Sequence, residues 1–73
     1  MTFHYYEETD SLYIDLQDRP GVESQEVRPG VVLDFDAEGA LVGIDIDHAS
    51  KNANLGRVEI LGLLGSAVAM AEV

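Results

Sequence analysis

Four aspartates and a histidine near the middle of the chain are the residues whose types and spacing could do chemistry. They are Asp34, Asp36, Asp45, Asp47 and His48. Carboxylate oxygens are ligands for hard cations such as Ca²⁺ and Mg²⁺, and an imidazole would extend the set to transition metals. Side chains two apart on a strand project in parallel, whereas a tight metal site needs ligands that converge. We therefore expect a solvated strand face and no cofactor, with Asp34, Asp45, Asp47 and His48 as the weak candidates for metal ligands.

A small metal-dependent or hydrolytic enzyme is the alternative function for the same residues. Paired carboxylates, or His4 or His48 as a general base beside Asp47, would supply acid–base chemistry. No pattern marks a nucleophile, an oxyanion hole or a phosphate-binding glycine loop, and Gly39 and Gly43 are explained by a turn and by close strand packing. We therefore predict that the protein is not an enzyme.

The chain is acidic, with 14 Asp and Glu against 4 Lys and Arg, a formal net charge of −10. Such a surface repels phosphate backbones, so we expect no direct binding of nucleic acid. It attracts cationic surfaces, so we expect a non-catalytic binding module with a basic protein as partner. The alternative is that the charge only keeps a small protein soluble.

Neither a membrane span nor a secretory signal is expected. The longest uncharged stretch, Ile60 to Ala71, has 12 residues, fewer than the roughly 20 that cross a bilayer. Residues 1–6 lack a basic region followed by an apolar run. Because the chain has no cysteine, it needs no oxidising compartment, and we expect a cytoplasmic protein.

The elements that must position the acidic residues are strands. Alternating apolar positions and turn-forming residues predict a single domain, residues 1–73, whose sheet covers 2–47. The expected antiparallel strands are residues 2–6, 11–17, 22–27, 31–36 and 40–47. Arg19-Pro20-Gly21 and Arg28-Pro29-Gly30 are turn signals. They bracket residues 22–27, a polar segment expected at a sheet edge.

The pairing of residues 31–36 with 40–47 can be predicted in register. The apolar residues of both strands must share one face, so directly paired residue numbers must sum to an odd value, 75 or 77. Either register sends Asp34, Asp36, Asp45 and Asp47 together to the opposite face.

The C-terminal part is expected to be helical over residues 49–72. Residues 49–56 form a stretch of small residues that suits one or two helical turns ended by glycine. In residues 58–73, apolar residues recur at spacings of three and four. The fold class is therefore α+β: a small sheet of four to five strands in meander-like hairpins, then a helical segment. Its apolar side chains are too numerous to leave in water, which predicts a homo-oligomer, most simply a dimer. The expected interface residues are Ile60, Leu61, Leu63, Leu64 and Val68.

Three tyrosines, Tyr5, Tyr6 and Tyr13, lie in the first two expected strands. Tyrosine is enriched at protein interfaces, so the group could form a partner-binding patch. Cross-strand packing with the hydroxyls at the rim is the alternative, and we favour it.

From Tyr5 to Lys51 the chain resembles a family of short prokaryotic proteins, the domain of unknown function 2283 family. The residues that carry the resemblance are Tyr5, Glu8-Thr9-Asp10-Ser11-Leu12-Tyr13-Ile14, Pro29-Gly30-Val31-Val32-Leu33-Asp34-Phe35-Asp36, Gly39, Val42-Gly43-Ile44-Asp45-Ile46 and Ala49-Ser50. The chain departs from the family at Tyr6-Glu7, which often reads Asp-Pro, and at His48, which is often Asp. The resemblance implies an acidic partner of the kind found in small two-gene modules of toxin and antitoxin type.

Overall fold

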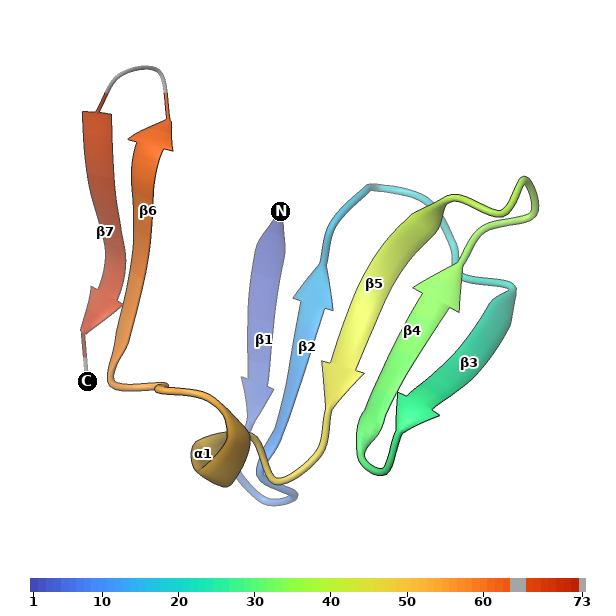
Figure 1. Ribbon diagram of the computed structural model, residues 1–73, viewed down its shortest axis with the longest axis horizontal. Coiled ribbons are helices and arrows are strands. Elements are labelled where there is room, and N and C mark those ends of the chain that lie inside the picture. The colour runs from blue at the N-terminus through green and yellow to red at the C-terminus, as the bar shows by residue number, and fades with distance from the viewer. Residues whose placement is uncertain (64–65, 73) are drawn as a thin grey trace.

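The chain forms a five-stranded antiparallel sheet followed by one helical turn and a two-stranded hairpin (Figure 1). The computed structural model describes residues 1–63 and 66–72, and side chains as far as residue 62. The elements are β1 (Thr2–Tyr6), β2 (Ser11–Asp15), β3 (Glu23–Arg28), β4 (Val31–Phe35), β5 (Leu41–Ile46), α1 (Ala49–Asn52), β6 (Arg57–Leu63) and β7 (Ser66–Glu72). The five strands expected over residues 2–47 are therefore confirmed, with ends that differ by one or two residues.

The strand order β1-β2-β5-β4-β3 is not the simple meander that was expected. The hairpins β1–β2, β3–β4 and β4–β5 are present, but β2 pairs with β5 instead of β3. The reason is burial. Leu12 and Ile14 of β2 lie opposite Ile46 and Ile44 of β5, whereas every residue of β3 is exposed. A strand that is polar on both faces stabilises a central position poorly, so β3 lies at the edge, as its composition predicts.

The predicted register of β4 and β5 is confirmed. Val31 pairs with Ile46 and Leu33 with Ile44, so the paired numbers sum to 77. A bulge then shifts the register, and Phe35 pairs with Leu41. Beside this bulge lies Val42, whose side chain is only 1% exposed.

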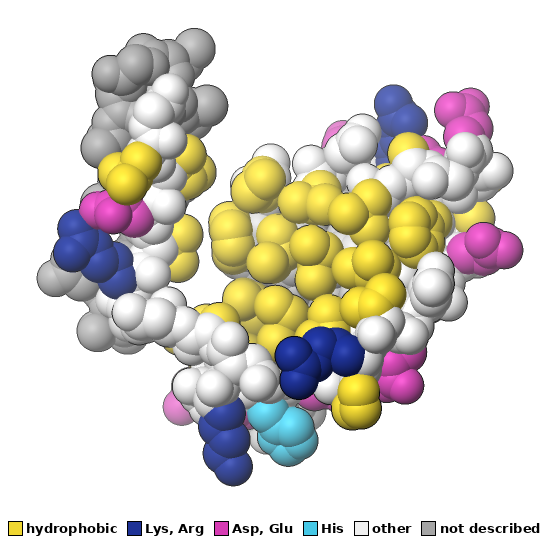
Figure 2. Space-filling view, viewed as in Figure 1, with side chains coloured by type: hydrophobic (Ala, Val, Ile, Leu, Met, Phe, Trp, Pro, Cys, Tyr) yellow, Lys and Arg dark blue, Asp and Glu magenta, His cyan; other side chains and the backbone are white. Residues whose placement is uncertain are grey.

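The register gives the sheet two different faces. We call the apolar face the one that carries Phe3, Tyr5, Leu12, Ile14, Val31, Leu33, Phe35, Ile44 and Ile46. The opposite face carries Asp15, Tyr13, Asp34 and Asp45, whose positions alternate with these residues along the strands. Figure 2 shows the apolar side chains as one continuous patch with charged groups at its rim.

The prediction of a C-terminal helical segment over residues 49–72 is confirmed for one turn, Ala49–Asn52, and is wrong beyond it, and with it the α+β class is wrong. Among the residues that the structure describes, only Ala49–Asn52 is helical, and β6 and β7 pair as antiparallel strands, so the fold is mainly β. Gly62 adopts φ +83°, which interrupts a helix, and an internal glycine costs a helix about 1 kcal/mol. The polar–apolar alternation of Arg57, Val58, Glu59 and Ile60 has the period of two that a strand requires.

Candidate functional site

The candidate functional site is the acidic face of the sheet, which we define by Asp15, Asp34, Asp45 and Asp47. Asp15 belongs to β2, Asp34 to β4 and Asp45 to β5, and Asp47 directly follows β5. Gly43 of β5 pairs with both Asp15 and Asp34, so carboxylates from the two flanking strands lie on either side of one glycine. Asp15 was not among the predicted residues, although its alternation with Tyr13 in the sequence was a sufficient signal.

The electrostatics of this face show crowding among the carboxylates. The pKa of Asp45 is raised above its ordinary value, first by burial and then by the negative charges of Asp47 and Asp34. The ion pairs among the described side chains, Arg19–Asp36 and Arg57–Glu59, involve no residue of the acidic face. Its negative charge is therefore not neutralised by cationic side chains of the described part of the chain.

Asp34 is held by two hydroxyl groups from neighbouring strands. The Tyr13 hydroxyl donates to Asp34 Oδ2 at 2.9 Å, and the Ser24 hydroxyl donates to Asp34 Oδ1 at 2.7 Å. Burial and the bond to Asp34 raise the pKa of Tyr13 to about 12, so this hydroxyl remains a donor at neutral pH. Both oxygens of Asp34 therefore have protein partners, which makes Asp34 a poor metal ligand or catalytic base.

The Tyr13 ring lies over Gly43. A side-chain Cβ placed on Gly43 would lie 2.5 Å from Tyr13 Cζ and closer still to its hydroxyl oxygen. Only a residue without a side chain therefore allows Tyr13 to reach Asp34 across β5. Sequence reasoning attributed Gly43 to close strand packing, and the structure identifies Tyr13 as the group that packs there.

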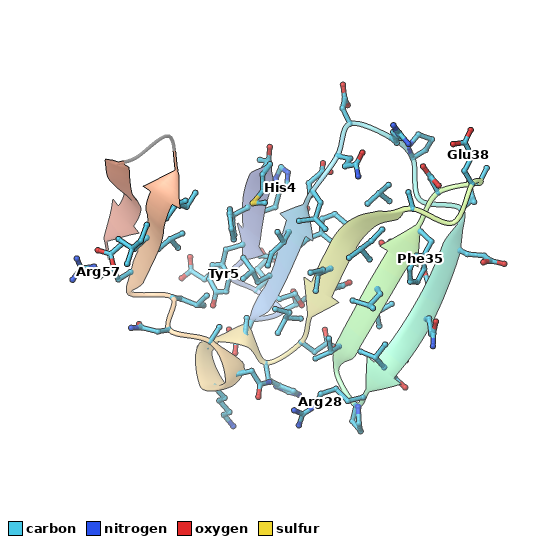
Figure 3. The ribbon with its side chains drawn as sticks, turned by 45° about the horizontal axis from the view of Figure 1, so that its top comes forward. His4, Tyr5, Arg28, Phe35, Glu38 and Arg57 are labelled. Atoms are coloured by element: carbon cyan, nitrogen blue, oxygen red, sulfur yellow. The ribbon has the colours of Figure 1, made fainter. Side chains whose placement is uncertain are left out.

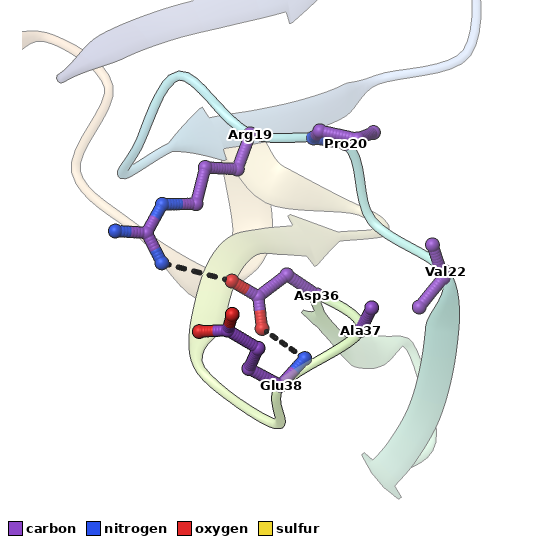
Figure 4. A pocket seen from close by; sticks show the side chains of 6 residues that line it. All are labelled: Arg19, Pro20, Val22, Asp36, Ala37 and Glu38. Carbon is purple, nitrogen blue, oxygen red and sulfur yellow. Dashed lines mark hydrogen bonds and ion pairs between the residues drawn. The ribbon is translucent and has the colours of Figure 1, made fainter.

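Asp36 was predicted to share the acidic face, and this is wrong, because the chain turns directly after β4. Its carboxylate accepts hydrogen bonds from the backbone N–H groups of Glu38 and Ala40 at 2.9 Å, and it pairs with Arg19 at 3.1 Å. The Ala40 N–H, and after it Arg19, lower the pKa of Asp36. Figure 4 shows this carboxylate in a shallow pocket of about 320 Å³ at the β4–β5 turn. Asp36 therefore caps a turn.

Asp10 connects the β1–β2 turn to α1, a role that sequence reasoning missed. Its backbone carbonyl accepts the Ala49 N–H at 2.9 Å, while its carboxylate accepts the Ser50 N–H at 3.0 Å and the Ser50 hydroxyl at 2.7 Å. The Tyr5 hydroxyl donates to the same carboxylate at 2.8 Å. The Ser50 hydroxyl, and after it that of Tyr5, lower the pKa of Asp10. Asp10 has φ 52°, a left-handed conformation that aspartate tolerates well.

The four candidate metal ligands do not form a metal site in the described structure. His48 lies beyond the end of β5, in the left-handed conformation with φ 51°, and precedes α1. Among the described residues, no three His, Asp or Glu side chains are placed to share a metal ion. His4 is on β1, far along the chain from His48 and on the opposite edge of β2 from Asp45. The described structure therefore does not bring His4, His48 and Asp45 together.

The three tyrosines do not form one group. Tyr5 projects on the apolar face and is 46% exposed, whereas Tyr13 and Tyr6 project on the other side, where Tyr6 is 55% exposed. Figure 3 shows the Tyr5 side chain on the side of β1 that is nearest the β6–β7 hairpin. Tyr13 packs across strands as favoured, and Tyr5 lies at an exposed apolar surface.

The predicted interface residues lie on the C-terminal hairpin. Leu61 is 68% exposed and Ile60 is half-buried. Leu64 lies outside the described residues, and the side chains of Leu63 and Val68 are likewise outside the described part. A dimer through this segment therefore remains a prediction.

The described part of the chain is a small antiparallel β protein whose sheet has one apolar and one acidic face, and none of its described helices is long and apolar enough to cross a membrane. Residues 2–50 match the family described as Protein of unknown function (DUF2283), and the chain belongs to this family. No curated protein and no solved structure shows a significant match. The family match ends within α1, so the β6–β7 hairpin lies outside it.

Proposed function

We propose that the protein is a non-catalytic protein-binding module whose acidic face binds a basic protein, in the manner of an antitoxin that neutralises its partner. A cytoplasmic setting is part of this proposal, because a chain without cysteine needs no oxidising compartment to fold.

The observation that supports this proposal is the uncompensated charge of the acidic face. The pKa of Asp45 is raised first by burial and then by the negative charges of Asp47 and Asp34, so these carboxylates lie close enough to repel one another. Lysine or arginine side chains of a partner would relieve this repulsion on binding. The face is a broad strand surface, which suits a protein partner better than a small ligand, since small ligands bind in concave pockets.

Residues within the family match keep the acidic face in its observed conformation. Gly43 makes room for Tyr13, Tyr13 holds Asp34, and Asp10 fastens the strand turn to α1. These contacts are structural and leave Asp45 and Asp47 as the acidic groups best placed to meet a partner.

The test is a comparison of two variants with the same change in charge. Asp45→Asn/Asp47→Asn neutralises the acidic face, whereas Glu7→Gln/Glu8→Gln neutralises two exposed carboxylates in the β1–β2 turn. A basic protein, first sought as the product of the adjacent gene, is purified and titrated against each variant. We expect the acidic-face variant to weaken binding about tenfold or more and the turn variant to change it less than about twofold.

Two results would count against the proposal. If no basic protein binds the purified wild-type chain, the acidity serves solubility. If both variants weaken binding equally, net charge steers the partner and the acidic face is not its binding surface.

A further inference from the structure

The apolar face of the sheet has no covering layer in the described structure. Phe3 is 40% exposed and Tyr5 46% exposed, and the only buried apolar side chains among the described residues are Leu12, Val42 and Ala49. Figure 2 shows the apolar patch open toward the viewer. A sheet buries its apolar face against a second layer in stable domains, and the described part of the chain does not contain such a layer.

The β6–β7 hairpin does not supply that layer. It stands beyond β1 and makes few contacts with the five-stranded sheet (Figure 1). Between the two lies an open groove of about 690 Å³. Its walls are Phe3, Tyr5, Leu12, Ile14 and Ile46 on the sheet side and residues 53–59 on the other.

The surface area of the chain gives the size of the missing contact. The chain exposes 5493 Å², whereas a compact monomer of 7.9 kDa exposes about 4,400 Å². The excess of about 1,100 Å² is larger than the roughly 800 Å² that each partner buries in a stable interface of standard size. The radius of gyration, 13.3 Å, is likewise above the about 11 Å of a compact domain of this length.

We propose that a second copy of this chain covers the apolar face, so that two sheets pack face to face. The strand positions at the centre of this face are all apolar, so the surface is complementary to itself, as a two-fold interface requires. Packed sheets lie about 10 Å apart.

The distribution of charge is compatible with a second copy. Two chains of charge −10 repel each other unless their carboxylates stay apart. Face-to-face packing places the acidic faces on the two outer surfaces of the dimer, because Asp34 and Asp45 project away from the apolar face. The dimer does not depend on the proposed basic partner, and it differs from an interface made by the hairpin alone.

Adjacent residues of β4 provide a matched test. Leu33 lies on the apolar face and Val32 on the opposite face, and both are partly exposed in the single chain. Sedimentation equilibrium of the full chain should give twice the mass of 7.9 kDa. Leu33→Arg should abolish the dimer, and Val32→Arg, which carries the same added charge, should retain it.

Because Leu33→Arg can also prevent folding, single cysteines give a second measurement. The chain has no cysteine, so Leu33→Cys and Val32→Cys each carry one thiol for a maleimide. Well above the dimer Kd, where mass action keeps most chains paired, the thiol at position 33 should react about tenfold more slowly than that at position 32. The two rates should converge on dilution below Kd.

Each other occupant of the apolar face gives a different result. If the wild-type chain is a monomer and the thiol of Leu33→Cys still reacts slowly, the hairpin of the same chain closes over the sheet. A monomer with equal reactivity at both positions would show that a different protein covers the face. A dimer with equal reactivity would place the interface elsewhere, and each of these three results overturns the proposal.

Discussion

Because the Tyr13 ring packs over Gly43, we expect Gly43→Ala to have opposite effects on stability in the wild-type chain and in the Tyr13→Ala variant. In the wild-type chain, Gly43→Ala would place a Cβ 2.5 Å from Tyr13 Cζ, so the ring must move and its bond to Asp34 is lost. Overpacking of this kind costs about 1–3 kcal/mol. About 2 kcal/mol lowers the melting temperature of a domain of this size by roughly 8–16 °C.

In the Tyr13→Ala background the same substitution meets no ring. An alanine within a strand is then favoured over glycine by about 0.5–1 kcal/mol, because glycine loses more backbone entropy on folding. We therefore expect Gly43→Ala to destabilise the wild type and to stabilise Tyr13→Ala. The coupling energy between the two positions should be about 2 kcal/mol or more.

The measurement is urea denaturation followed by circular dichroism for the four members of the cycle. Protein concentration must be held fixed, since association would make stability depend on it. Gly39→Ala serves as a control, because Gly39 has φ +84° and no atom near its Cβ position. Its cost is conformational and should be equal in both backgrounds. An equal cost of Gly43→Ala in both backgrounds would refute the packing argument.

Three further predictions concern the charged groups. Asp45→Asn should raise the melting temperature at pH 7, because the pKa of Asp45 is raised in the folded protein and its ionisation therefore opposes folding. The gain should vanish below the ordinary pKa of 3.8, where Asp45 is protonated in both the folded and the unfolded chain. Added NaCl should stabilise the wild type more than this variant, and a flat or falling response would contradict the crowding. Asp10→Ala should lower the melting temperature at pH 7 by several degrees, and Asp10→Asn by less, since asparagine tolerates the left-handed backbone conformation. Because the pKa of Asp10 is lowered in the folded protein, the stability that its carboxylate contributes is present above pH 3.8 and is lost as the pH falls through the lowered pKa. In an ultraviolet pH titration, Tyr13 should ionise near pH 12, and the stability that its hydroxyl contributes should be lost as the pH rises from 10 to about 12. If the titration above pH 10 is the same in Tyr13→Phe, the ionisation near pH 12 does not belong to Tyr13.

The acidic face shows how far the candidate site could be predicted. The alternation of Asp34 with Leu33 and of Asp45 with Ile44 places these carboxylates together without knowledge of the structure. The same alternation gives a wrong prediction for Asp36, because its side chain folds back and accepts hydrogen bonds from the turn. The hydrogen bonds between Asp10 and Ser50 could not be predicted from the spacing of residues in the sequence, since the two residues are 40 positions apart and are brought together only by the paired strands.

Several features could be predicted from the amino-acid sequence: the five strands, the register of β4 with β5, the segregation of apolar and acidic residues, and membership of the family. These follow from a period of two and from turn residues, which are local properties of the chain. Three features could be found only in the tertiary structure: β2 pairs with β5, Tyr13 packs on Gly43, and the C-terminal hairpin lies beside the sheet. These features depend on which distant surfaces bury each other, and a local pattern of apolar residues is compatible with several such pairings.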